Sequence, residues 1–119
     1  MQEDPITGTI GAEISGIDLK GPISDDLAAT LRDALSRRLV LVFRGQHLDI
    51  AAQKRLTGVF GTPVQLPYIV PTDDDPQVVR VLKEADDHSG TFGGDWHSDM
   101  SFVAEPPAGS VLNALELPP

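Results

Sequence analysis

Two stretches of the sequence repeat apolar residues every three or four positions, which is the spacing of one helical face. They cover 25–38 and 50–60, and each follows a side chain that caps helix N-termini, Ser24 and Asp49 respectively. Gly61 is a typical residue just beyond a helix end. The pattern therefore predicts two helices with these bounds.

Other apolar runs are too short for helices and predict strands. Residues 39–43 form a continuous apolar run, typical of a strand buried on both faces. The remaining predicted strands are one or two within 6–19, an edge strand at 64–70, and strands at 77–83, 96–102 and 109–117. Turns at 72–76 and 104–108 and a glycine-containing loop at 84–95 separate them. Two helices among so many strands, without regular alternation, predict a mainly β fold with flanking helices.

Composition limits the partners. The chain has 119 residues, so it is one domain or part of one, and its net charge of −9 argues against nucleic acid or an anionic membrane as a partner. It has no cysteine, which excludes disulfides and cysteine-bound metal clusters. The sequence shows neither a signal-peptide pattern nor an apolar run of membrane-spanning length, so we expect a cytoplasmic protein.

Candidate chemistry lies in the predicted strand 96–102. Side chains two apart on a strand share a face, so His97 and Asp99 are predicted to lie side by side. Imidazole and carboxylate are two of the three ligands in the 2-His-1-carboxylate sites of non-haem iron enzymes. The spacing alone is a weak signal, because a hydrogen-bonded surface pair has the same spacing. A structural zinc site that adds His88 is a third interpretation.

Other residues that could take part in a site also have structural interpretations. Trp96 and Phe102 are expected to pack in the core, or else to shield the pair from water. His88 lies in the loop and His47 in a turn, and both are expected to be exposed. Three consecutive aspartates at 73–75 predict a solvated turn, since calcium loops place their ligands at alternate positions.

Five segments, in order along the chain, resemble the TauD/TfdA family of Fe(II)- and 2-oxoglutarate-dependent dioxygenases. They are 11–19, 39–46, 60–63, 96–102 and 106–109. The resemblance runs along nearly the whole sequence and implies that residues 1–119 are the N-terminal portion of one dioxygenase domain. The implied fold is a partial double-stranded β-helix, also called a jelly roll and similar to cupins.

The resemblance implies His97 and Asp99 as two of three iron ligands, with Fe(II) and 2-oxoglutarate as cofactors. Such enzymes use O₂ to hydroxylate a small organic substrate and release succinate and CO₂. The third ligand and the 2-oxoglutarate anchor are expected beyond residue 119, so the chain alone is expected to be inactive. A fragment, part of a longer protein and a truncated gene product all remain open, as does the oligomeric state. The alternative is a non-catalytic jelly-roll-like module that binds a ligand or dimerises.

The resemblance also implies substrate contacts. By position, Met100 and Tyr68 are expected to line the substrate pocket. Leu66 and Gly93 are also expected at substrate-binding positions. The family's taurine enzyme has a histidine at the position of Leu66 and an asparagine near Gly93, and neither is present here. These two differences argue against taurine as the substrate.

Overall fold

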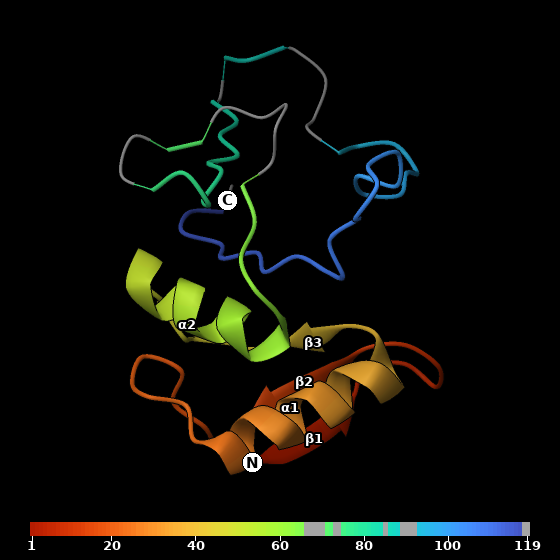
Figure 1. The fold of residues 1–119 in the computed structure, drawn as a ribbon, viewed down its shortest axis with the longest axis vertical. Helices are drawn as coiled ribbons and strands as arrows, with labels where there is room; N and C mark the ends of the chain where they lie inside the picture. Colours follow the sequence, from red (N-terminus) through yellow and green to blue (C-terminus); the bar gives the residue numbers. More distant parts are fainter. Residues whose placement is uncertain (66–70, 73–74, 85, 89–92, 118–119) are drawn as a thin grey trace. The chain divides into compact units, whose positions relative to one another are not determined.

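The computed structural model describes residues 1–65, 71–72, 75–84, 86–88 and 93–117 (Figure 1). It divides into two compact units. The first, here called the N-terminal unit, joins Met1–Thr62 to Ser110–Pro119, and the second, the inserted unit, is Pro63–Gly109. All helices and strands of the described ranges belong to the N-terminal unit.

A small mixed sheet forms one layer of the N-terminal unit. β1 (Gln2–Pro5) pairs with β2 (Ala12–Ser15) in antiparallel fashion, and β2 pairs in parallel with β3 (Leu41–Val42). The order β1-β2-β3 makes β2 the central strand. The register places Ile14 of β2 opposite Glu3 of β1.

Both predicted helices form with the predicted bounds. α1 spans Asp25–Arg38 and α2 spans Ile50–Phe60. The side chains of Ser24 and Asp49 each accept the backbone N–H three positions on, at 3.3 and 2.7 Å. Neither α1 nor α2, the helices of the described residues, has the length and hydrophobicity of a membrane span.

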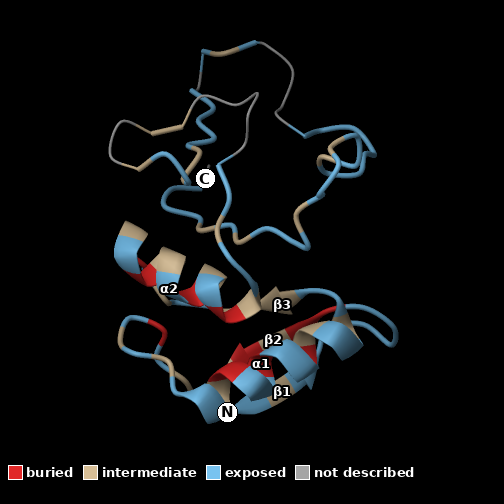
Figure 2. Cartoon of the chain, viewed as in Figure 1, coloured by how far each residue is buried: buried red, intermediate tan, exposed pale blue. Residues whose placement is uncertain are grey.

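One apolar cluster lies between the sheet and the two helices (Figure 2). Its buried members are Ala12, Ile14, Leu19, Ala28, Leu31, Leu48, Ala52, Leu56 and Val59. Every buried residue of the described ranges lies between positions 11 and 59. The core therefore belongs to the N-terminal unit.

Gln46 ties two loops of this unit together. Its Oε1 accepts the Leu19 N–H at 3.0 Å, and its Nε2 donates to the Ile17 carbonyl at 3.2 Å. The segment after β3 thus has a specific partner in the loop that follows β2.

The strands predicted at 77–83, 96–102 and 109–117 are wrong. Their described residues form turns, bends and irregular backbone. A strand needs a second strand to pair its backbone groups, whereas a helix pairs them within itself. Of the predicted edge strand 64–70, residues 66–70 lie outside the described residues. The described residues form a small mixed sheet with two helices, so the flanking helices are confirmed and the larger β architecture stays a prediction.

The apolar run 39–43 is also different from the prediction. Only Leu41–Val42 pair as a strand, and both are half-buried. Leu39 instead ends α1 in the left-handed region, with φ 64°, and its N–H donates to the Leu35 carbonyl at 2.7 Å. Its side chain is 65% exposed.

We expect Leu39→Gly to be more stable than Leu39→Ala by about 1 kcal/mol, because a Cβ is unfavourable in the left-handed region and glycine has none. Both variants lose the same exposed side chain, so alanine is the matched control. Urea denaturation gives the two free energies of unfolding. Equal free energies of unfolding would show that a Cβ at position 39 has no cost in the left-handed conformation.

Glu3 links β1 to the last turn of α1. Its two carboxylate oxygens accept from Arg37 Nη1 and Nη2 at 3.0 and 2.9 Å, and Oε1 also accepts from Arg38 Nε at 2.7 Å. These hydrogen bonds, first from Arg37 and then from Arg38, lower the pKa of Glu3 from 4.5 to about 2.

We expect the stability contributed by Glu3 to be fully present above its unfolded pKa of 4.5 and to disappear as pH falls toward the folded value of about 2. The folded state binds fewer protons in this window, so acid favours unfolding. Urea midpoints of wild type and Glu3→Gln should therefore converge as pH falls from about 5 to about 2. Arg37→Gln should reduce the same pH dependence, and a difference that stays constant over this range would contradict the role of Glu3.

Candidate metal centre

His97 and Asp99 lie together in the inserted unit. His97 Nε2 is 2.9 Å from Asp99 Oδ1, and the two side chains are 50% and 60% exposed. On the other edge of the ring, Nδ1 is 2.6 Å from the backbone carbonyl oxygen of Asp95. Two oxygen atoms therefore hold the imidazole along its Nδ1–Nε2 direction.

The carbonyl of Asp95 determines how the ring carries its protons. A carbonyl only accepts, so Nδ1 is the protonated nitrogen and donates to it. In the neutral ring, Nε2 then carries the lone pair. The hydrogen bond to Asp95 is the main cause that raises the pKa of His97 above 6.5, and the negative charge of Asp99 adds to it.

The separation of the two donor atoms is compatible with a bound metal ion as well as with a hydrogen bond between them. Metal bonds of about 2.0–2.2 Å at a right angle place two donor atoms about 3 Å apart. The observed 2.9 Å between His97 Nε2 and Asp99 Oδ1 fits this separation, and it equally fits an imidazolium donating to a carboxylate. The donor set of imidazole nitrogen and carboxylate oxygen is therefore compatible with Fe(II).

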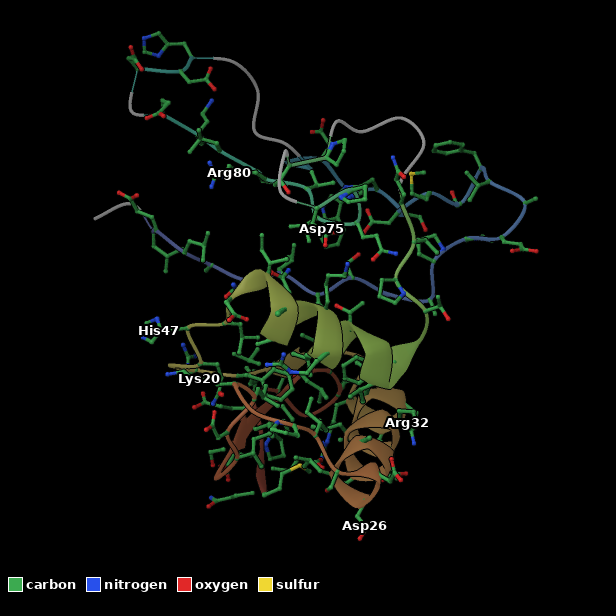
Figure 3. All side chains as sticks on the ribbon, turned by 60° about the vertical axis from the view of Figure 1, so that its left-hand side comes forward. Lys20, Asp26, Arg32, His47, Asp75 and Arg80 are labelled. Carbon is green, nitrogen blue, oxygen red and sulfur yellow. The ribbon has the colours of Figure 1, made fainter. Side chains whose placement is uncertain are left out.

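The zinc interpretation with His88 is wrong. Among the described residues, which include His88, His97 and Asp99, no three His, Asp or Glu side chains are grouped to hold a metal ion. His88 is exposed, as predicted. His47 is exposed too and lies in the turn before α2 (Figure 3).

The predicted pairing of His97 with Asp99 is confirmed, but its predicted cause is wrong. Residues 96–102 do not form a strand. Met100 adopts a left-handed conformation, with φ 49°, and its carbonyl accepts the Val103 N–H at 3.1 Å. The two side chains therefore meet across irregular backbone at 97–98, just before this turn, where strand alternation had been expected to bring them together.

Gly93 lies against the imidazole ring of His97. A Cβ built on Gly93 would be 3.3 Å from His97 Cε1, and the glycine has φ +68°. Sequence reasoning treated Gly93 as a substrate contact and did not predict this one. The signal available was a glycine in the loop just before the pair, whereas the role of the Asp95 carbonyl has no signal because every residue has a carbonyl.

The other predicted site residues have different outcomes. Met100 is half-buried next to the pair, and its substrate contact stays a prediction. Leu66 and Tyr68 lie outside the described residues. The expected core packing of Trp96 and Phe102 is wrong, since Trp96 is fully exposed and Phe102 is 72% exposed.

The imidazole nitrogen of His97 and the carboxylate oxygen of Asp99 are two donors of the kinds that bind iron in mononuclear metal proteins. Residues 2–119 match the model of the family described as taurine catabolism dioxygenase TauD, TfdA family. The chain therefore belongs to the TauD/TfdA family.

Several relatives share this sequence over most of its length. The chain is 38% identical to an alkylsulfatase from Acinetobacter baylyi, over 99% of this chain and 36% of that protein. It is 34% identical to an alpha-ketoglutarate-dependent sulfate ester dioxygenase from Pseudomonas putida, over 96% of this chain and 37% of that protein. The chain thus spans about a third of the length of these relatives.

A solved structure supports the same family. A taurine dioxygenase from Burkholderia xenovorans superposes with a TM-score of 0.59 at 33% identity. The superposition covers 63% of this chain and 27% of that protein.

We expect Gly93→Ala to weaken metal binding by about tenfold, because the new Cβ strains the backbone and displaces the His97 ring by a few tenths of an ångström. Gly109→Ala is the matched control, since a Cβ there meets nothing within 4 Å. Calorimetric titration of the full-length protein with Mn(II) measures the metal affinity of both variants. Equal affinity of the two variants would show that contact with Gly93 does not position the ring.

Proposed function

We propose that the full-length protein is an Fe(II)- and 2-oxoglutarate-dependent dioxygenase with a jelly-roll fold. The observation that carries the proposal is the 2.9 Å approach of His97 Nε2 and Asp99 Oδ1, within a chain that belongs to the TauD/TfdA family. The name of the relative from Pseudomonas putida supports dependence on 2-oxoglutarate, which is alpha-ketoglutarate. In this proposal residues 1–119 are the N-terminal portion of a single dioxygenase domain.

His97 and Asp99 would hold the iron, and the rest of the full-length protein would provide the third ligand and the 2-oxoglutarate anchor. Iron with 2-oxoglutarate and O₂ supplies the oxidising chemistry, in which the keto acid becomes succinate and CO₂ while the substrate gains one oxygen atom. Neighbouring residues of this chain orient His97 and determine which of its nitrogens is free for the metal.

Three features of the inserted unit prepare His97 for this role. The Asp95 carbonyl keeps the proton on Nδ1, which leaves Nε2 for the metal. Asp99 adds a negative charge beside it, and Gly93 leaves room for the ring. Half of each ligand side chain is exposed, so both are accessible to a metal ion and its other ligands.

We propose sulfate esters of small alcohols as the first substrate class to test. The names of the two relatives that match nearly the whole chain support this class. Hydroxylation of the carbon that bears the ester oxygen gives a product that separates into an aldehyde and inorganic sulfate. Taurine is expected to be a poorer substrate, because the taurine enzyme's histidine at the position of Leu66 and its asparagine near Gly93 are both absent here.

We expect His97→Ala and Asp99→Ala each to lower turnover by more than about a hundredfold, because each removes an iron ligand. His88→Ala is the matched control and should keep wild-type activity, since His88 is exposed and is not grouped with the pair. The measurement is substrate-dependent succinate release by the full-length protein with Fe(II) and 2-oxoglutarate.

Alkyl sulfates, taurine and an aryloxyacetate are compared as substrates, and inorganic sulfate is measured alongside succinate. Wild-type turnover by His97→Ala would overturn the iron assignment. Succinate release with taurine but not with alkyl sulfates would overturn the substrate class while leaving the reaction class intact.

A further inference from the structure

The inserted unit, which contains His97 and Asp99, leaves and rejoins the N-terminal unit through two connections. The chain leaves after Thr62, just past the end of α2, and returns at Ser110. We call residues 110–113 the return segment. In Figure 1 this part of the blue chain runs beside α2.

Two side-chain amides attach the return segment to the start of α2. Gln53 Nε2 donates to the Val111 carbonyl at 3.1 Å, and Asn113 Nδ2 donates to the Leu48 carbonyl at 2.9 Å. Both hydrogen bonds are partly buried, and the Val111 side chain packs against the apolar cluster. The attachment thus combines an apolar contact with two directional bonds.

The two bonds also determine the direction of the return segment. Val111 lies at Gln53 and Asn113 lies at Leu48, so the segment runs opposite to α2. Together the two bonds hold the position and the register of the return segment.

We propose that Gln53 and Asn113 are positioning residues for the metal centre. They act through the covalent chain, because holding the return segment closes the inserted unit at its second end. An open connection would leave the unit tethered only at Thr62, with greater conformational freedom to lose when the centre assembles. This inference rests on the proposed function for its metal readout.

The test compares three variants that remove an amide while keeping similar side-chain size. Gln53→Met and Asn113→Leu each remove one bond to the return segment. Gln46→Met is the matched control, because Gln46 is a partly buried amide of the same unit with two bonds to the loop at Ile17 and Leu19. Gln53→Lys keeps an N–H donor of similar reach and is the rescue variant.

We expect Gln53→Met and Asn113→Leu each to weaken Mn(II) binding by the full-length protein about two- to tenfold. Losing one hydrogen bond usually changes an equilibrium constant by about this factor. Gln46→Met should lower Tm at least as much and leave Mn(II) affinity unchanged. Gln53→Lys should restore most of the affinity. Unchanged affinity in both return-segment variants, or equal weakening by Gln46→Met, would overturn the proposal.

A second measurement separates this inference from the proposed function. Hydrogen exchange of the amides at 93–101, measured without metal, should accelerate in Gln53→Met and Asn113→Leu but not in Gln46→Met. If wild type bound no Mn(II), the proposed function would fail, and hydrogen exchange would still decide whether the return segment orders the 93–101 region. Unchanged hydrogen exchange in the return-segment variants would show that the return segment does not order residues 93–101.

Discussion

The shared apolar cluster is the interaction on which the N-terminal unit depends. β2 buries Ala12 and Ile14, which are 0% and 2% exposed, and α1 and α2 contribute Leu31 and Leu56 to the same cluster. None of these elements is stable alone, because an isolated helix as short as α2 is marginal in water and β3 has only two residues. Burying each large apolar side chain contributes about 1.5–3 kcal/mol, so the cluster stabilises the sheet and both helices together.

How well the sequence predicts each element follows from how local its interactions are. The two helices were predicted with their observed bounds, because a cap such as Ser24 or Asp49 bonds a backbone group only three residues away. The strands after residue 76 were predicted incorrectly, since a strand depends on a distant partner that the local pattern does not specify. Leu39 shows the same limit, because an apolar residue expected in a strand instead ends α1.

In the candidate site, too, the sequence predicts some contacts and not others. His97 and Asp99 were predicted to pair because i and i+2 share a strand face, and irregular backbone at 97–98 produces the same proximity. The spacing was therefore informative even though the predicted conformation was wrong. The contacts that orient the ring come from the backbone of Asp95 and the missing side chain of Gly93, and neither leaves a pattern of apolar and polar positions.

The exposure of the pair favours a functional interpretation over a structural one. An ion pair whose side chains are about half exposed contributes little to stability, and holding an imidazole in one orientation costs conformational entropy. Yet His97 is held by the Asp95 carbonyl, the Asp99 carboxylate and close contact with Gly93. Such restraint stabilises the fold little, but in the proposed function it would reduce the entropy lost on metal binding, because Nε2 and Oδ1 already lie at a suitable separation.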